Sequence, residues 1–359
     1  MTIRAFGAPH RYIQGPDALN ELATLVPLYG RRPFVVADVA VLGTLRPQLQ
    51  ALLQPLSDDL SFAEFSGECS AKQIDALAAQ AEAAKSDLVI AIGGGKAIDT
   101  AKGVRIKRGS GIIVVPTVAS NDAPTSRLAV VYTDDHVLSE VRLMPTNPDA
   151  VIVDTAIIAR APRRFFVAGI GDAMSKKFEV EQCYNSGGMN FYKARPTELA
   201  VSIAGQCYQV IRRDAVASLA AADRKIPDAA FESIVEATIL LSGLGFESGG
   251  LSIAHSLTRG FSAIPSLNNA LHGEQVAFGT LVQLCLEQRD DAFLADMVAF
   301  YRALGLPTSL NGLGFSGDAQ DAIATIASRS IAEAPYLKQF AGPVTQQNLV
   351  AAIEKANRL

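Results

Sequence analysis

Apolar runs of strand length alternate with helical patterns through the first 160 residues, and this alternation constrains the fold most strongly. Residues 33–38 (PFVVAD), 87–92 (DLVIAI) and 111–115 (GIIVV) are apolar almost throughout. Residues 71–85 and 97–107 between them have the apolar spacing of helices. Strands read as continuous apolar runs when helices cover a parallel sheet on both faces. The pattern therefore predicts an α/β domain built from βαβ units.

The strand patterns end after residues 151–154 (VIVD), and the rest of the chain is dominated by helical patterns. A chain of 359 residues has the length of two domains, which we expect at 1–160 (α/β) and 161–359 (all-helical). Residues 128–132 (LAVVY), with Asp134, Asp135 and His136 after them, predict a hairpin added to the parallel sheet. No flexible linker separates the halves, so the crevice between them is the expected ligand site.

Composition excludes several classes of protein. The net charge is −4 and there are no basic blocks, which argues against sequence-independent binding of nucleic acid. The four cysteines are far apart and form no CxxC pair, so we expect reduced, mostly buried thiols in a cytoplasmic protein. The N-terminus has no signal-peptide core, and no unbroken apolar run approaches the ~18 residues of a membrane helix.

A glycine-rich turn follows the strand at 87–92. Gly93, Gly94 and Gly95 would let a ligand approach the backbone, and the next helix would present its N-terminus to a phosphate. The segment is neither a Walker A loop nor a GxGxxG fingerprint, because Ile98 stands at the third glycine position of the latter. The alternative is a tight turn without a ligand.

Two further segments have a functional and a purely structural interpretation. Asp38 ends an apolar strand, where a carboxylate can bind ribose hydroxyls and disfavour NADP, although a helix cap is the commoner role. Residues 116–126 (PTVASNDAPTS) are rich in small hydroxyl side chains that could bind ribose, nicotinamide or a polyol, or form a solvated turn.

Histidine is scarce, with four in the chain. His10 and His136 lie in polar contexts and are expected on the surface, whereas His255 and His272 lie in small or apolar helical segments. Asp172, expected at a helix start, could be a third metal ligand with them. Hydrogen-bonded core histidines and an aspartate N-cap are the alternatives, because the spacing matches no metal motif such as HExxH.

Several segments make the chain resemble the iron-containing alcohol dehydrogenase superfamily and, within it, the zinc-dependent glycerol dehydrogenases. The matching segments are GGGKAIDTAK (93–102), PTVASNDAPTS (116–126), AGIGDAMSKKFE (168–179), NFYKARPTELA (190–200), GLGFESGGLSIAH (243–255) and LHGEQVAFGTL (271–281). The resemblance implies an N-terminal Rossmann-like NAD-binding domain. It also implies an all-α C-terminal domain of the dehydroquinate synthase-like fold, with a metal in the cleft.

The resemblance also implies roles for particular residues. Asp172, His255 and His272 match the metal ligands of the family, and Asp122 matches a carboxylate that contacts substrate hydroxyls. The positions that match NAD contacts are Asp38, Gly94, Gly95, Lys96, Asp99, Thr117, Ser120, Ser126, Leu128 and Tyr132.

Two positions depart from relatives in the superfamily. Iron-dependent relatives have a fourth ligand, a histidine, where this chain has Lys176. Three Asp/His/His ligands leave an open coordination position, as catalytic zinc requires, although Fe²⁺ or Mn²⁺ is compatible with them. Thr258 stands where the glycerol dehydrogenases have another histidine, a change that bears on the substrate pocket.

The resemblance implies an NAD-dependent dehydrogenase that oxidises a small polyol, with glycerol giving dihydroxyacetone, and that forms a homo-oligomer. The alternatives within the superfamily are enzymes that act on another diol, a hydroxycarboxylate or glycerol 1-phosphate. A non-catalytic NAD-binding protein is a further alternative, but it would have no need of a metal site and Asp122.

Overall fold

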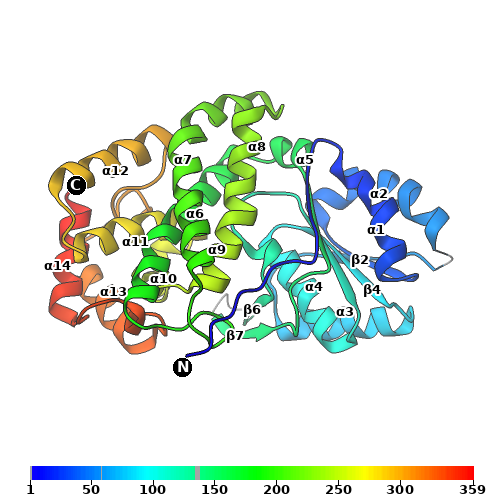
Figure 1. Cartoon of the computed structure of the whole chain (residues 1–359), viewed down its shortest axis with the longest axis horizontal. Coiled ribbons are helices and arrows are strands. Elements are labelled where there is room, and N and C mark those ends of the chain that lie inside the picture. The colour runs from blue at the N-terminus through cyan, green and yellow to red at the C-terminus, as the bar shows by residue number, and fades with distance from the viewer. Residues whose placement is uncertain (1, 58, 134–137) are drawn as a thin grey trace. The chain divides into compact units, whose positions relative to one another are not determined.

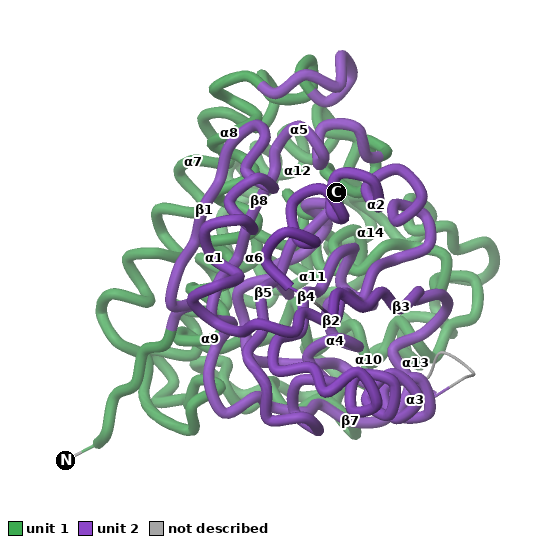
Figure 2. The backbone as a smooth tube through the Cα atoms, turned by 90° about the vertical axis from the view of Figure 1, so that its right-hand side faces the viewer, with its two compact units in different colours: residues 1–7, 162–221, 228–359 green, residues 8–161, 222–227 purple. Residues whose placement is uncertain are grey.

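The computed structural model describes residues 2–57, 59–133 and 138–359 (Figure 1). The chain forms two compact units, which Figure 2 shows in different colours. The α/β unit comprises residues 8–161 and 222–227, and the helical unit comprises residues 1–7, 162–221 and 228–359. Nothing in the sequence pattern indicated that the first seven residues belong with the helical unit.

Six parallel strands form the sheet of the α/β unit, in the order β1-β8-β5-β4-β2-β3. Their bounds are Tyr12–Gly15 (β1), Pro33–Asp38 (β2), Ser61–Phe65 (β3), Leu88–Gly93 (β4), Gly111–Pro116 (β5) and Ala150–Asp154 (β8). Strands β2, β4, β5 and β8 are buried almost throughout, as their continuous apolar sequences predict.

Helices cover this sheet. Their bounds are Leu22–Tyr29 (α1), Val39–Leu53 (α2), Ala71–Ala83 (α3), Gly95–Arg108 (α4) and Thr155–Arg160 (α5). The apolar sides of α1 and α2 form one core cluster with alternate residues of the strands, among them Leu25 and Leu49 against Val35 and Ile90. Each such leucine contributes about 1.5–3 kcal/mol when it is fully buried. Helix α4 packs on β4, β5 and β2 and contacts α3.

The predicted hairpin exists, but it is not part of the parallel sheet. Strands β6 (Leu128–Tyr132) and β7 (Leu138–Leu143) form a separate two-stranded antiparallel sheet. The sheet edge beside β8 is already occupied by β1, and β6 instead bonds to the loop before α3, where the Tyr132 amide donates to the Cys69 carbonyl. Residues 134–137, with His136, lie outside the described residues, and His10 is exposed as predicted.

The helical unit is built from α-helices that range from 8 to 27 residues in length. Their bounds are Arg163–Asn185 (α6), Glu198–Arg224 (α7), Ala229–Glu236 (α8), Ser242–Gly249 (α9), Ile253–Phe261 (α10), His272–Leu286 (α11), Asp291–Leu304 (α12), Ala319–Glu333 (α13) and Gln346–Asn357 (α14). Aspartate side chains cap several N-termini, including Asp228 before α8 and Asp290 before α12. The parallel α/β domain and the helix-rich second half confirm the predicted fold class.

One stretch of the helical unit resembles a membrane span by length and composition. Residues 229–249, which form α8, a π-helical turn and α9, have a mean hydropathy of 1.4 over the most apolar window. In that window 56% of the residues are buried inside the protein, so length and composition alone are weak evidence for a membrane span. All four cysteines are buried, as predicted, and no disulfide joins them.

Candidate metal and dinucleotide sites

Helix α6 places three charged side chains on one face in the interior of the helical unit. Asp172, Lys176 and Glu179 are spaced i, i+4 and i+7, so they lie above one another along the helix. None of the three residues is more than 1% exposed. Asp172 was expected at a helix start, and this was wrong, because α6 begins nine residues earlier at Arg163. Asp172 is therefore not an N-cap residue.

Glycines allow the helices that carry the site to approach closely. A Cβ atom on Gly171 of α6 would lie 2.5 Å from the carbonyl oxygen of Gly273 on α11, and a Cβ atom on Gly273 would overlap the backbone of Ala168. A larger residue at either position would force the two helices apart. The close approach brings His272, the first residue of α11, next to Asp172.

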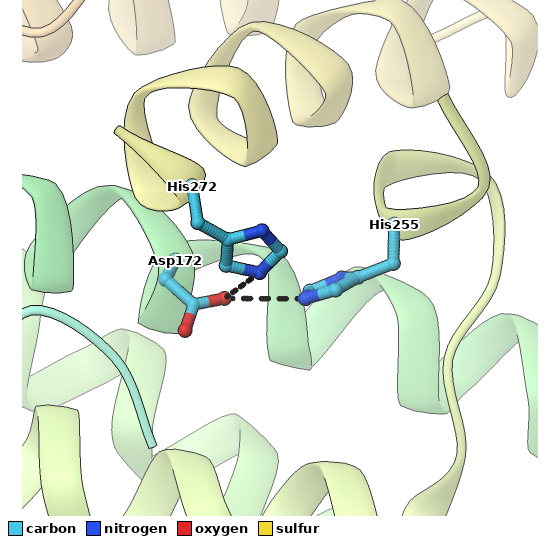
Figure 3. Close-up of side chains that lie close together, drawn as sticks. All are labelled: Asp172, His255 and His272. Carbon is cyan, nitrogen blue, oxygen red and sulfur yellow. Dashed lines mark ion pairs between the residues drawn. The ribbon is translucent and has the colours of Figure 1, made fainter. Parts of the chain in front are cut away.

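Asp172, His255 and His272 converge, as Figure 3 shows. Asp172 Oδ1 lies 3.2 Å from His255 Nε2 on α10 and 4.0 Å from His272 Nε2 on α11. Each residue offers one ligand atom, and the three atoms lie within 4.8 Å of one another. The structure thus brings together the three residues that the family resemblance names as metal ligands.

Glu179 orients the ring of His255 from behind. Glu179 Oε2 lies 2.5 Å from His255 Nδ1, and its Oε1 accepts hydrogen bonds from the amides of Ser252 at 2.9 Å and His255 at 3.0 Å. A carboxylate accepts a hydrogen bond from a protonated nitrogen, so Nδ1 of His255 carries a proton that faces Glu179. Nε2 then faces Asp172 and His272. Histidines that bind metals commonly have such a carboxylate partner.

Lys176 also points into this cluster. Its Nζ lies 2.5 Å from Asp172 Oδ1 and 3.3 Å from His255 Nε2, and its side chain is 0% exposed. The ring of Phe246 lies 5.8 Å from the ammonium. The site therefore contains a buried cation of its own beside the candidate ligand atoms.

Burial and the charges of the cluster shift the pKa values of Asp172, Glu179 and His255. Burial alone would raise the pKa values of Asp172 and Glu179, but Lys176 acts most strongly on Asp172 and His255 on Glu179, and both values fall below their usual range. Burial would lower the pKa of His255, but the charge of Glu179 and the hydrogen bonds to both carboxylates raise it to about 9. Both carboxylates are thus ionised at neutral pH.

The donor set fits a divalent metal ion. Two imidazole nitrogens and one carboxylate oxygen from three helices match the N/O ligands of catalytic zinc sites, which keep a fourth position open. The bond from His255 Nδ1 to Glu179 supplies the outer support that such ligands need. Nothing in the residue types selects zinc over iron or manganese.

The candidate dinucleotide site lies at the carboxyl ends of β2 and β4. From β2 the chain leads to β3 on one side, and from β4 it leads to β5 on the other, so the two neighbouring strands form a topological switch point. Ligands of parallel sheets bind at such points. Asp38 ends β2 and Gly93 ends β4.

Geometry requires a glycine at position 93, where the turn begins. Gly93 has φ +152°, and a Cβ atom there would lie 2.7 Å from Ala97 Cβ and 3.0 Å from Asp38 Cβ. Helix α4 then begins at Gly95 without a side-chain cap. A helix N-terminus beside a glycine turn is a suitable place for a phosphate group.

Asp38 does act as a helix cap, because its Oδ1 accepts a hydrogen bond from the Ala40 amide of α2 at 2.9 Å.

A buried lysine ties the remaining loop to α4. Lys102 Nζ bonds to Asp99 Oδ1 at 3.2 Å and to the carbonyl oxygens of Ala123 and Leu128 at 2.7 and 2.5 Å. The other oxygen of Asp99 accepts the Val130 amide at 3.0 Å. Asp99 and Leu128, both predicted to contact the cofactor, thus take part in holding this loop.

The other predicted residues of the α/β unit differ in exposure. Thr117, Asp122, Ser126 and Leu128 are buried, Asp38, Gly94, Gly95, Ser120 and Tyr132 are half-buried, and Lys96 is exposed and paired with Glu68. In the helical unit, the Thr258 hydroxyl donates to the His255 carbonyl at 2.7 Å.

Two residues of these sites were missed from the sequence. Glu179 could have been found, because a second carboxylate seven residues after Asp172 falls on the same face of the helix. Lys102 could have been found in the same way, because it follows Asp99 by three residues and so lies beside it on the buried side of α4. Lys176 was recognised as a departure from a fourth ligand, but its contact with Asp172 was not predicted.

A glycine turn at the switch point of a parallel sheet, together with a histidine and carboxylate donor set on helices, is typical of metal-dependent dehydrogenases. The family of iron-containing alcohol dehydrogenases matches residues 9–155. The glycerol dehydrogenase of Escherichia coli O6:H1 (strain CFT073) is 37% identical over 355 residues, 99% of this chain and 97% of that protein.

Two more comparisons extend this similarity. The glycolaldehyde reductase of Halobacterium salinarum is 36% identical and covers 99% of this chain and 97% of its own length. The crystal structure of a probable glycerol dehydrogenase from Sinorhizobium meliloti 1021 is 39% identical, with a TM-score of 0.93 and 99% of both chains covered. The chain therefore belongs to the iron-containing alcohol dehydrogenase family and is an oxidoreductase. The resemblance seen in the sequence is confirmed.

Proposed function

We propose that this protein oxidises a small polyol, with glycerol giving dihydroxyacetone, and uses NAD⁺ and a Zn²⁺ ion. The observation that carries the proposal is the convergence of Asp172, His255 and His272 within 4.8 Å. The similarity to glycerol dehydrogenases over nearly the whole chain supports the polyol substrate.

In this proposal the helical unit holds the metal ion. Asp172 Oδ1 and the Nε2 atoms of His255 and His272 are the ligand atoms, and Glu179 keeps the proton of His255 on Nδ1. When bound, Zn²⁺ supplies a Lewis acid that lowers the pKa of a substrate hydroxyl. By family resemblance, Asp122 orients a substrate hydroxyl. Lys176 replaces a fourth protein ligand, which leaves a position for the substrate.

The α/β unit binds the dinucleotide. The amides at the start of α4, with Gly94, Gly95 and Lys96, bind the pyrophosphate, and Asp38 binds the adenosine ribose and repels a 2′-phosphate. When bound, NAD⁺ supplies the acceptor for the hydride that leaves the substrate carbon. The family resemblance adds Asp99, Thr117, Ser120, Ser126, Leu128 and Tyr132 as further contacts, and it also supports a cytoplasmic homo-oligomer.

A second candidate substrate is a small hydroxyaldehyde, which the enzyme would reduce. The observation that favours it is the 36% identity to a protein named glycolaldehyde reductase. The chemistry is the reverse of alcohol oxidation and needs the same residues, so the relative rates with glycerol and NAD⁺ and with glycolaldehyde and NADH distinguish the two. The same assay also includes a 1,2-diol, a 2-hydroxy acid and glycerol 1-phosphate as candidate substrates.

The test of the proposed function is a His272→Ala variant measured for both metal content and turnover. We expect the variant to lose bound Zn²⁺ and at least about 10²-fold in kcat/KM, because two ligands remain. His10→Ala, which removes an exposed histidine of the α/β unit, is the matched control. Full activity and normal metal content in His272→Ala would refute the metal assignment. Equal efficiency with NAD⁺ and NADP⁺ would refute the role of Asp38.

A further inference from the structure

Lys176 and a metal ion would need the same atoms. Lys176 Nζ lies 2.5 Å from Asp172 Oδ1 and 3.3 Å from His255 Nε2, which are two of the three candidate ligand atoms. A metal ion can bind His255 only when the imidazole is neutral, with its proton on Nδ1 and its one lone pair on Nε2. That lone pair either accepts from the ammonium or binds a metal at about 2.0–2.1 Å.

We propose that Lys176 is a built-in competitor of the metal, holding Asp172 and His255 in the metal-free protein and leaving them when the ion binds. This inference rests on the proposed function, because it takes Asp172, His255 and His272 as the metal ligands. It goes further by assigning to Lys176 a role in setting metal affinity.

The charges of the cluster lead to the same conclusion. In the state that can bind a metal both imidazoles are neutral, and the buried groups Asp172, Glu179 and Lys176 then carry two negative charges and one positive charge. A divalent ion therefore enters a cluster of net charge −1, whereas without the ammonium it would enter one of −2. Because the side chains of all three residues are at most 1% exposed, solvent screens this difference poorly.

The same contacts give Lys176 a stabilising role when no metal is bound. Its ammonium is the cation nearest to Asp172, which is 1% exposed, and removing one partner of a buried ion pair is strongly destabilising. Removal of the ammonium should therefore have opposite effects on the two states, weakening the metal-free protein and strengthening metal binding. A lysine that only supported the fold would not tighten metal binding when it is removed.

The test is the Lys176→Met variant, which keeps the length of the side chain and removes its charge. The full-length protein is stripped with a chelator, and Zn²⁺ affinity is measured by competition with a chromophoric chelator of known affinity. We expect Lys176→Met to bind Zn²⁺ at least about tenfold more tightly than the unmodified protein. We also expect a lower melting temperature without metal and a larger rise in melting temperature on addition of Zn²⁺.

Lys177→Met is the matched control. Lys177 is the next residue of α6 and loses the same charge, but its ammonium pairs with Glu181 rather than with Asp172. We expect its Zn²⁺ affinity to stay within about threefold of the unmodified protein, since its charge is partly exposed and screened. If Lys176→Met does not fold, Lys176→Gln takes its place, because the neutral amide can still donate to Asp172.

Several outcomes would overturn the proposal. Unchanged or weaker Zn²⁺ binding in Lys176→Met would show that Lys176 does not compete with the metal. If the unmodified protein binds Zn²⁺ and His272→Ala does not, the metal site of the proposed function stands and only the role of Lys176 fails. If Lys177→Met also binds Zn²⁺ about tenfold more tightly, the effect comes from the net charge of the protein and not from the contact of Lys176 with the ligand atoms. If neither the unmodified protein nor Lys176→Met binds Zn²⁺, the metal site of the proposed function fails as well. Tight binding that persists in Lys176→Met/His272→Ala would place the ion elsewhere.

Discussion

Glu179→Gln tests how the helical unit prepares His255 for a metal. The two oxygens of Glu179 have separate partners: Oε1 accepts the amides of Ser252 and His255, and Oε2 faces His255 Nδ1. In the variant the amide oxygen has to stay with the two backbone donors, because its NH₂ group cannot accept them. The NH₂ group therefore replaces Oε2 and points at Nδ1.

This exchange reverses the tautomer of the imidazole. An NH₂ donor requires Nδ1 of His255 to be an acceptor, so the ring proton moves to Nε2 and occupies the lone pair that would bind the metal. Loss of an outer carboxylate of this kind typically weakens metal binding by about 10–100-fold. That range corresponds to about 1.4–2.8 kcal/mol of binding free energy.

The assay is Zn²⁺ affinity by chelator competition, together with the melting temperature of the metal-free protein. Glu181→Gln, on the same helix but paired with Lys177, is the control and should bind Zn²⁺ normally. Glu179→Gln should stay folded, because its two backbone hydrogen bonds are kept. In contrast, Glu179→Ala leaves two buried amides without an acceptor and should lose about 2–4 kcal/mol of stability. A Zn²⁺ affinity of Glu179→Gln within threefold of the unmodified protein would refute the tautomer argument.

Three further predictions concern other groups. The raised pKa of His255, from 6.5 to about 9, stabilises the metal-free protein fully below pH 6.5, and this stabilisation is lost as the pH rises to about 9. Urea unfolding in the presence of EDTA should show a loss of about 3 kcal/mol across that range, and a flat profile would contradict it. Asp38→Asn keeps the helix cap but removes the charge, so the NADP⁺ to NAD⁺ ratio of kcat/KM should rise at least about tenfold at an unchanged melting temperature. Burial raises the pKa of Cys69 and Cys183 to about 12 and that of Cys285 to about 11, so a disulfide reagent near pH 8 should label the native protein at fewer than one thiol. Labelling of several thiols before unfolding would show that the cysteines are accessible.

The sequence predicted those strands whose surroundings are apolar on both faces. β2, β4, β5 and β8 are of this kind, and each lies within one residue of the range expected for it. β1 and β3 were missed because they are the edge strands and carry polar residues such as Gln14 and Glu64. An edge strand is half-exposed and therefore lacks a continuous apolar run.

The site was predictable in its residue types but not in its local structure. Gly169 and Gly171 made the segment before Asp172 look like a helix start, since glycine disfavours helix interiors. At Gly171 the absence of a side chain instead allows the contact with Gly273, which depends on a helix about a hundred residues later. The contacts of Lys176 and Glu179 with His255 could not be predicted for the same reason. Spacing along α6 does not show which side chains of α10 and α11 pack against it.

The first residues of the chain impose an order on folding. Residues 1–7 belong to the helical unit, where the Arg195 amide donates to the Ile3 carbonyl at 2.9 Å and Arg4 forms a β-bridge with Arg195. At about 5–20 residues per second, a ribosome needs roughly 10–40 s to synthesise the partner of this segment. Residues 1–7 therefore have no partner until the whole α/β unit has been synthesised. Each unit is made of separate stretches of the chain, so neither can be expressed as one continuous piece. Splitting the gene at residue 161 would leave the helical half without its first strand-like segment.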